Sequence, residues 1–337
     1  MNAMTSLGLV QSGPLTEGMP AMQRQDKDSY ALPTEPTHQT CAVVFNPTKV
    51  DDDFTGLMRE ALDGAGFAGV HWVETSADDP GHAMTAEAVA AQVDLVVVAG
   101  GDGTVRVVAS NLVGTGIPLG IIPAGTANLL ARNLDLPLKL RPALEVVVGG
   151  HTRAIDMVEL TVDDGAPERF AVMAGTGLDA MIMDEVDPVL KAKVGSAAYF
   201  IAAGKAVGQL PIPLEITIDG GRTRRRQAML CVIGNVGELQ GGISLIPQAR
   251  VNDGLLHVYV ASPRHVGHWL KALFRLITRR PSDNDHVDLW HGRDVTVRSG
   301  SVTSYQMDGD VIGEGTRLHA VVLPAALTVC VGSDSST

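Results

Sequence analysis

From residue 41 onward, apolar runs alternate with amphipathic stretches in the order that a doubly wound α/β sheet requires. The apolar runs predict strands at 41–47, 69–75, 95–99 and 117–122. Between them, apolar residues recur at helical spacing and predict helices over 52–65, 83–91 and 105–112. This alternation implies parallel strands, whose polar signatures gather at the carboxyl ends. We therefore expect a first α/β domain over residues 40–154.

The pattern changes after about residue 155, where short β-like runs are separated by Gly, Pro and Asp turns. The runs lie at 170–173, 214–219, 227–234, 254–261, 294–298 and 316–323. Two helical segments, 190–209 and 265–280, interrupt them. We expect a mostly antiparallel, β-rich domain of two packed sheets over residues 155–320. Residues 321–337 form a C-terminal segment that can return to the first domain, and residues 1–39 read as a flexible extension.

Charge and cysteine content narrow the class of protein. With 26 basic and 38 acidic residues the 337-residue chain has a net charge of −12, which argues against a general affinity for nucleic acid. Cys41, Cys231 and Cys330 each lie in an apolar run and are expected to be buried thiols in a reducing compartment. Because no basic residue precedes Arg24, the N-terminus does not read as a signal peptide, and we expect a cytoplasmic protein.

One local basic segment stands out against this acidic background. Residues 264–280 carry five Lys or Arg side chains and no acidic residue, together with an apolar side that includes Trp269 and Phe274. This composition is typical of a helix that lies in a membrane interface. The alternative is an ordinary amphipathic helix that packs on the second domain with its basic face in water. The first interpretation predicts peripheral membrane association.

The most informative motif is the run VVVAGGDGT, residues 96–104, which ends a buried strand in three glycines. Gly100, Gly101 and Gly103 can adopt positive φ and bring backbone N–H groups against a polyphosphate. Asp102 would repel that phosphate unless Mg²⁺ or a hydrogen-bond network engages it. Taken alone, the motif is also compatible with a tight turn after a core strand. A Walker A lysine motif is absent, so a phosphate site here is of another type.

Further motifs follow in a fixed order along the chain. They are Asn46-Pro47-Thr48, residues 74–81, 100–104, 123–128 and 174–180, Gly234-Asn235, Gly241-Gly242, residues 247–249 and 253–256, and Asp308-Gly309-Asp310. In their order and spacing the sequence resembles the diacylglycerol kinase catalytic family of soluble bacterial lipid kinases. It is also similar to sphingosine kinases and, more distantly, to NAD kinases and phosphofructokinases. The resemblance implies an NAD kinase-like nucleotide domain and a C-terminal β-sandwich that binds lipid, with the active site between them.

The resemblance also implies ATP and Mg²⁺ as cofactors and a set of site residues. Phosphoryl transfer needs nucleotide clamping, a cation and a carboxylate that accepts the hydroxyl proton. The expected ATP-binding residues are Asn46, Thr48, Thr75, Gly100, Gly101, Asp102, Gly103, Thr104, Gly125, Thr126 and Asn128. Asp102 and Asp179 are the expected carboxylates that act through water on the catalytic Mg²⁺.

Asp308 is the expected general base, with Asp310 beside it as the second catalytic carboxylate. At the position of Asp310 the family usually has Glu, whose side chain is one methylene longer. The alternative for Asp308 is a plain turn residue, because Asp-Gly is a strong hairpin signal. If Asp308 is the base, we expect Asp308→Ala to lower turnover by orders of magnitude while the fold and ATP binding stay intact.

A second cation site is implied at Asp253, where the family holds a structural Mg²⁺ with backbone carbonyls, here those of Arg250 and Leu255. Carboxylate and carbonyl oxygens suit this hard cation. The position after residues 253–256 is commonly acidic in the family and is His257 here. We do not expect His257 to be catalytic.

Diacylglycerol is the leading substrate that the resemblance implies. A sphingoid base, ceramide, phosphatidylglycerol or another amphiphilic alcohol stays open, because an apolar pocket discriminates acyl chains weakly. NAD kinase is a second enzymatic alternative and a non-catalytic nucleotide or lipid sensor a third. The expected partner is a lipid substrate at a membrane surface, with no nucleic acid, and a homodimer is left open.

Overall fold

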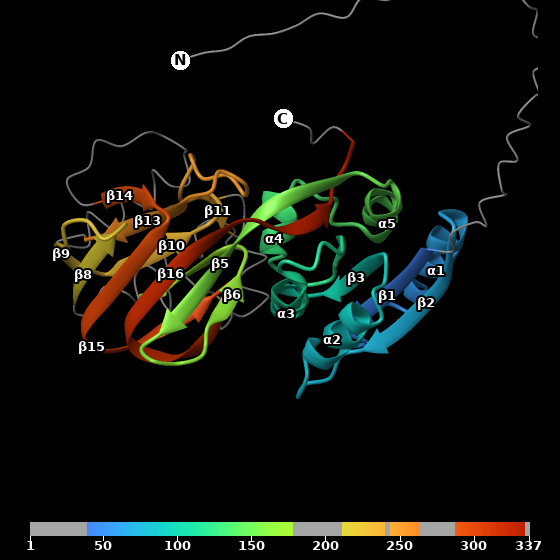
Figure 1. Ribbon diagram of the computed structural model, residues 1–337, viewed down its shortest axis with the longest axis horizontal. Helices are drawn as coiled ribbons and strands as arrows, with labels where there is room; N and C mark the ends of the chain where they lie inside the picture. The colour runs from blue at the N-terminus through green and yellow to red at the C-terminus, as the bar shows by residue number, and fades with distance from the viewer. Residues whose placement is uncertain (1–38, 178–210, 240–242, 263–286, 334–337) are drawn as a thin grey trace, which may run out of the picture. The chain divides into compact units, whose positions relative to one another are not determined.

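The computed structural model describes residues 39–177, 211–239, 243–262 and 287–333 (Figure 1). Most of the predicted N-terminal extension, both predicted helical segments of the second half, Gly241-Gly242 and Asp179 lie outside the described residues. Among the described residues, no helix is long and apolar enough to cross a membrane.

The first half is a doubly wound α/β domain, as predicted. Its elements are β1 (Gln39–Phe45), α1 (Phe54–Gly64), β2 (Phe67–Glu74), α2 (His82–Ala90), β3 (Leu95–Gly100), α3 (Asp102–Leu112), β4 (Leu119–Pro123), α4 (Leu129–Asn133) and α5 (Leu140–Val148). The strands pair in parallel in the order β4-β3-β1-β2. The short helices α4 and α5 follow the last predicted strand of this half, and the sequence pattern did not reveal them.

Alternating side chains of the parallel strands pack on helices on both faces of the sheet. On β1, Cys41 and Val43 belong to the core cluster of α1 and α5, whereas Ala42 and Val44 belong to the cluster of α2, α3 and α4. All six residues of β3 are buried, which is why the strand reads as a continuous apolar run. The three cysteines are buried free thiols, and burial raises the pKa of Cys41 to about 12.

The second half is β-rich and mostly antiparallel. Its strands are β5 (Thr152–Val162), β6 (Glu168–Phe170), β7 (Met173–Thr176), β8 (Ile212–Ile218), β9 (Arg224–Ala228), β10 (Leu230–Gly234), β11 (Glu238–Leu239), β12 (Ile243–Ser244), β13 (Leu256–Ala261), β14 (Val287–Gly292), β15 (Asp294–Met307) and β16 (Asp310–Cys330). Strands β7, β10, β13 and β14 form one layer, and β5, β6, β8, β9 and β16 form the other. Buried side chains from both layers pack into one core.

The long strand β15 joins the two layers. Its first part, residues 295–299, pairs with β8, and its last part, residues 305–307, pairs with β7. A register irregularity between Arg298 and Thr303 lies between these parts. The two predicted sheets are therefore one continuous hydrogen-bonded network that changes layer within β15.

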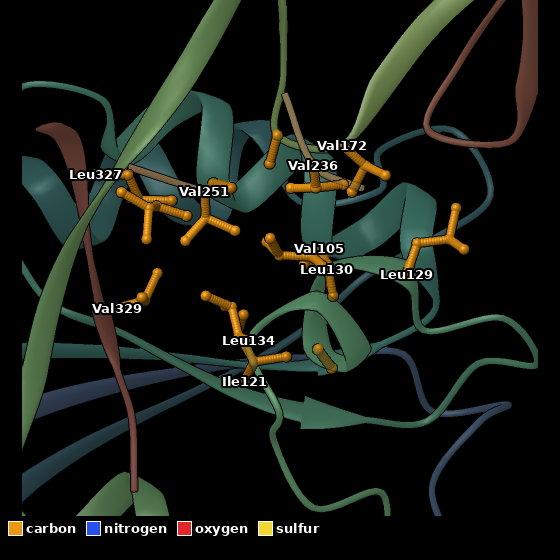
Figure 2. Close-up of a cluster of buried hydrophobic side chains, with 14 of the residues drawn as sticks. Val105, Ile121, Leu129, Leu130, Leu134, Val172, Val236, Val251, Leu327 and Val329 are labelled. Carbon is orange, nitrogen blue, oxygen red and sulfur yellow. The ribbon is translucent and has the colours of Figure 1, made fainter. Parts of the chain in front are cut away.

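Strand β16 connects the halves of the molecule. Its 21 residues pair with β15 and β5, and near its end Val329 pairs in parallel with Leu119 of β4. Strand β5 begins before the boundary expected at residue 155 and ends after it. A buried cluster adds side chains from both halves, including Val105 and Leu130 with Val172, Val236 and Leu327 (Figure 2). This packing fixes helix α3 against the β-rich half.

Candidate active site

The glycine motif connects β3 to α3. Gly100 ends the strand, Gly101 has extended backbone, and Asp102 begins the helix. None of Gly100, Gly101 and Gly103 has a positive φ, so these glycines do not adopt the left-handed backbone that the motif allows. The glycines serve close approach instead, because a Cβ on Gly100 would lie 2.8 Å from the Cβ of Thr104. The first N–H groups of α3 lack intrahelical acceptors, which makes this terminus suited to an anion.

A second glycine loop, residues 123–128, follows β4 and contacts the first. A Cβ on Gly125 would lie only 2.7 Å from the Cα of Gly101. Asn128 has left-handed backbone (φ 49°), and its side-chain amide accepts from the N–H of Gly125 and donates to the Gly125 carbonyl, both at 2.9 Å. Thr126 is exposed on this loop. The two expected phosphate loops therefore lie side by side at the carboxyl edge of the sheet.

Asp102 links these two loops. Its carboxylate accepts hydrogen bonds from the backbone N–H groups of Asn128, at 2.9 Å, and Leu129, at 2.5 Å. Burial raises the pKa of Asp102, and the nearby charge of Asp310 raises it further. Each carboxylate oxygen receives one of these bonds and retains acceptor capacity. Asp102 therefore has a structural role in the loop, and it fits a water-mediated contact with a cation carried by a polyphosphate.

The other expected ATP-binding residues lie at the same edge. The Asn46 N–H donates to the Ala99 carbonyl at 2.9 Å, and its side-chain oxygen accepts from the N–H and hydroxyl of Thr48. Thr75 follows β2 and donates its N–H to the Phe45 carbonyl at 2.8 Å. The side chains of Thr75 and Thr104 are buried, whereas Thr48 is exposed.

Asp79, in the 74–81 segment, has a structural role that the sequence pattern did not assign. Its carboxylate accepts from the backbone N–H groups of Gly81, His82 and Ala83 at the start of α2. These bonds lower its pKa. The residue therefore caps a helix.

Asp308 and Asp310 lie on the hairpin that joins β15 to β16. Asp308 and Gly309 form its two-residue turn and both have positive φ, as a type I′ turn requires. The Asp308 carboxylate is buried and accepts from the backbone N–H groups of Ala171, Val172 and Met173 at 2.9–3.2 Å. Burial raises its pKa to about 6, against the lowering effect of these bonds and of Arg106.

These contacts correct one expectation. Asp308→Ala would leave three buried N–H groups without their acceptor, so the substitution cannot leave the fold unaffected. Asp308 is both a hairpin residue and a buried carboxylate, and the two interpretations of the sequence are compatible.

Asp310 lies closer to the glycine loop. Its side chain is about half exposed, and its Oδ2 lies 3.1 Å from the position that a Cβ on Gly103 would occupy. The hairpin of the second half thus reaches the phosphate loop of the first half. The charge of Asp310 is also one of the causes that raise the Asp102 pKa.

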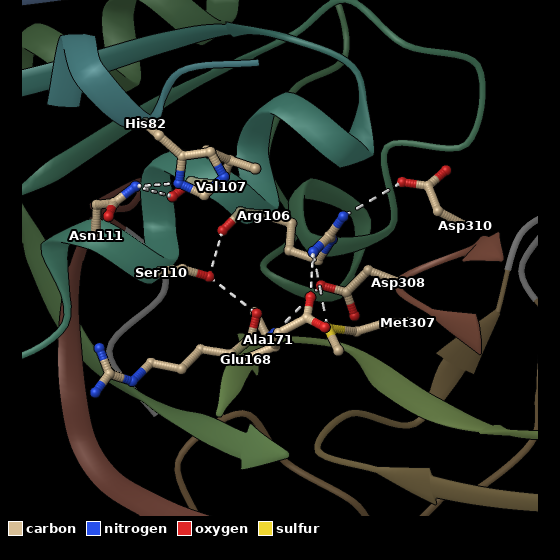
Figure 3. Close-up of polar contacts among 11 residues, drawn as sticks. His82, Arg106, Val107, Ser110, Asn111, Glu168, Ala171, Met307, Asp308 and Asp310 are labelled. Atoms are coloured by element: carbon tan, nitrogen blue, oxygen red, sulfur yellow. Dashed lines mark hydrogen bonds and ion pairs between the residues drawn. The ribbon is translucent and has the colours of Figure 1, made fainter. Parts of the chain in front are cut away.

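Arg106 is the charged residue that sequence reasoning missed. It lies on α3, one turn after Asp102, with its guanidinium 3.8 Å from an Asp310 oxygen and 3.9 Å from a Glu168 oxygen. Figure 3 shows it directed toward the hairpin and β6. The available signal was spacing, because residues four apart on a helix share a face. A single arginine in a mostly apolar helix otherwise reads as a solvated side chain.

The expected second cation site has a different arrangement. The Asp253 carboxylate accepts from the N–H groups of Arg250, at 3.1 Å, and Leu255, at 2.9 Å, and from His257 Nε2 at 2.9 Å. His257 is buried, and its Nδ1 has no hydrogen-bond partner among the described residues. Two donors occupy Asp253 Oδ2 and one N–H group donates to Oδ1, so Oδ1 is the carboxylate oxygen that retains acceptor capacity for a cation. In the described ranges, no group of three or more His, Cys, Asp or Glu side chains is arranged to hold a metal.

Comparison with known proteins identifies the family. Residues 40–160 match the diacylglycerol kinase catalytic domain, and residues 172–331 match the YegS C-terminal NAD kinase beta sandwich-like domain. A protein named "Diacylglycerol kinase" from Mycobacterium tuberculosis (strain H37Rv) is 33% identical over 243 residues, which cover 72% of this chain and 78% of the relative. "Probable lipid kinase YegS" of Escherichia coli O9:H4 (strain HS) is 32% identical over 239 residues, covering 69% and 76% of the two chains.

A solved structure shows the same fold. The crystal structure of a diacylglycerol kinase from Bacillus anthracis (strain Sterne) aligns with a TM-score of 0.70 at 24% identity. The alignment covers 89% of this chain and 99% of that one. The resemblance stated from the sequence motifs is thereby confirmed for both halves. The chain belongs to the diacylglycerol kinase catalytic-domain family, and its enzyme class is that of the lipid kinases.

Proposed function

We propose that this protein transfers the γ-phosphoryl group of ATP to the hydroxyl of diacylglycerol, giving phosphatidate and ADP. The observation that carries the proposal is the approach of the Asp308–Asp310 hairpin to the glycine loop, with Asp310 Oδ2 3.1 Å from a Cβ position on Gly103. Backbone donors suited to phosphate and carboxylates suited to proton transfer therefore meet at one point. Phosphoryl transfer needs both groups within reach of the reacting oxygen.

The proposed reaction follows from these positions. The glycine loops and the N-terminus of α3 hold the phosphates. A Mg²⁺ ion bound with ATP, within reach of Asp102, would offset charge on the triphosphate. Asp308 takes the proton of the lipid hydroxyl as that oxygen forms a bond to the γ-phosphorus. The bond between the γ-phosphorus and the bridging oxygen breaks, and ADP leaves.

The two hairpin carboxylates have different properties in this scheme. Asp308 has a pKa raised to about 6, which makes it a stronger base than a free carboxylate while it stays largely ionised at pH 7. Its Oδ2 receives one N–H bond and keeps acceptor capacity for a hydroxyl. Asp310 is more exposed and closer to the loop. Comparison of Asp308→Asn with Asp310→Asn separates them, because the base variant loses kcat by about 100-fold or more.

The substrate assignment rests on relatives that are named diacylglycerol kinase. It is tested with purified protein, labelled ATP and Mg²⁺ in mixed micelles. The acceptors are diacylglycerol, a sphingoid base, ceramide, phosphatidylglycerol and NAD⁺, each supplied alone. We expect label in phosphatidate. Transfer to another lipid alcohol would replace diacylglycerol as the proposed substrate, and transfer to NAD⁺ alone would overturn the assignment as a lipid kinase.

A lipid substrate also requires access to a membrane surface. We propose that the basic segment at residues 264–280, which lies outside the described residues, provides contact with anionic lipid from the cytoplasmic side. Its five basic side chains and apolar residues support this proposal.

A further inference from the structure

Arg106 is a nearly buried cation whose contacts are long. Its side chain is 14% exposed, yet its nearest carboxylate oxygens lie 3.8 and 3.9 Å from the guanidinium. Nη1 also lies 3.8 Å from the sulfur of Met307, the residue before Asp308. Nε is buried and has no hydrogen-bond partner among the described residues. The guanidinium therefore stands among acidic groups without being locked to any one of them.

Three carboxylates surround this cation. Glu168 comes from β6, and Asp308 and Asp310 come from the β15–β16 hairpin (Figure 3). Asp102 on α3 is near enough to Asp310 for the Asp310 charge to raise its pKa, and it adds a fourth carboxylate to the neighbourhood. Without a cation these groups would repel one another and favour protonation. Among the described residues, Arg106 is the cation that forms ion pairs with these carboxylates, namely with Glu168 and Asp310.

A purely structural ion pair is the competing explanation. Such a pair is expected to have close, bidentate contacts of about 2.7–2.9 Å. The distances here exceed hydrogen-bond length, so these contacts lack the geometry of such a pair. An electrostatic effect remains, because a charge acts over several ångströms in a site with little water. Consistent with this, Arg106 lowers the pKa of the buried Asp308.

We propose that Arg106 is a positioning residue of the kinase site, which keeps Asp308 ionised and holds the Asp310 side chain beside the glycine loop. The inference rests on the proposed function for its catalytic meaning. The effect of the Arg106 charge on ionisation of the buried Asp308 carboxylate does not depend on the identity of the lipid.

The pH dependence of kcat tests the proposal through charge-changing variants. Loss of the guanidinium in Arg106→Gln raises the pKa of Asp308, so the base stays protonated to higher pH and the acid limb of the profile moves up by about one unit. Activity then falls about fivefold at pH 6 and by only about a tenth at pH 8. Arg106→Lys retains the charge and is expected to follow the wild type. Glu168→Gln removes a negative charge and is expected to move the acid limb to lower pH.

Arg169 supplies the matched control. It is the residue after Glu168 on β6, but its guanidinium pairs with Glu159 at 3.1 Å. Arg169→Gln is expected to leave the limb where the wild type has it. An equal shift in this control, or a limb that moves in neither Arg106→Gln nor Glu168→Gln, would overturn the proposal. If Arg106→Gln does not fold, the direction of the Glu168→Gln shift decides.

A measurement without substrate separates this inference from the proposed function. Carbon-13 NMR of aspartate carboxyls, with Asp308→Asn used to assign the Asp308 resonance, gives the titration of that group directly. We expect a higher midpoint in Arg106→Gln than in the wild type and an unchanged one in Arg106→Lys. A wild type that phosphorylates no lipid while showing this shift rejects only the proposed function. Identical titrations in wild type and Arg106→Gln reject the role of Arg106.

Discussion

At the scale of single residues, Asp308 shows how burial and hydrogen bonding compete. Three backbone N–H groups and the charge of Arg106 favour its ionised form, and burial opposes ionisation. Burial is the stronger effect, because the pKa rises from 3.8 to about 6. The carboxylate is therefore held in place by its neighbours and is still able to accept a proton near neutral pH.

This shift makes stability depend on pH. Because the folded-state pKa of Asp308 is raised, the group stabilises the fold fully below about pH 3.8, and that contribution is lost as the pH rises through about 6. We expect the free energy of unfolding of the wild type to fall, relative to Asp308→Asn, by on the order of 3 kcal/mol between pH 4 and pH 7. Urea denaturation of both proteins across this range measures it. Parallel pH curves would contradict the assignment.

Truncation of the same side chain should also destabilise the fold. Asp308→Ala removes the acceptor of three buried N–H groups, which is expected to cost about 2–5 kcal/mol of unfolding free energy. Asp310→Ala is the matched control, since this carboxylate is about half exposed and two residues away. It should change stability by less than about 0.5 kcal/mol. Equal losses in the two variants would show that the Asp308 contacts carry little energy.

At the scale of elements, two loops separated in sequence pack backbone to backbone. A Cβ on Gly125 would lie 2.7 Å from the Cα of Gly101, so Gly125 has no room for a side chain, whereas a Cβ on Gly101 would make an ordinary contact of 3.6 Å with the Cα of Gly125. The Asp102 carboxylate accepts from the N–H groups of Asn128 and Leu129 and holds the second loop against the first, while the Asn128 side chain bonds to Gly125 within the second loop. The phosphate site is therefore built by a mutual fit of both loops and not by the GGDGT motif alone.

Gly125→Ala tests this fit. The new Cβ would lie 2.7 Å from backbone that cannot rotate away, so the loops must separate. We expect the KM for ATP to rise about tenfold or more and stability to fall by about 1–3 kcal/mol. Gly56→Ala in α1 is the control, because its Cβ would meet nothing within 4 Å and alanine favours helix. Unchanged ATP affinity in Gly125→Ala would show that the loop contact is dispensable.

The sequence predicted the parallel half well and the site only in part. Strands such as β3 were evident because burial on both faces leaves an uninterrupted apolar run. The lengths of strands β15 and β16 were underestimated, since exposed middle residues, such as Gly300 and Ser301 of β15, break the apolar pattern. The glycine contact and the position of Arg106 depend on tertiary approach, which local spacing does not encode. The role of Asp79 as a helix cap was equally hidden.

At the scale of the whole molecule, one strand and one core unite the two halves. Strand β16 pairs with β5 and β15 and reaches β4, while the cluster in Figure 2 packs helices of the first half against strands and loops of the second. The hairpin and the glycine loop are thus fixed by the same packing. Folding therefore brings the hairpin carboxylates beside the glycine loop.

The distribution of charge along the chain bears on contact with a membrane. The chain carries a net charge of −12, so anionic vesicles should repel it unless residues 264–280, with five basic and no acidic side chains, attract them locally. We expect the protein to float with vesicles containing anionic phospholipid and to remain unbound with neutral ones. Substitution of both Arg279 and Arg280 by Glu should abolish flotation, because each lost cation weakens binding by about 1 kcal/mol and each new charge adds repulsion.

The matched control replaces Arg222 and Arg225, which lie in the β8–β9 hairpin region, by Glu. Equal loss in the control would indicate a general charge effect, and flotation that survives the Arg279 and Arg280 substitutions would favour a segment packed on the second domain.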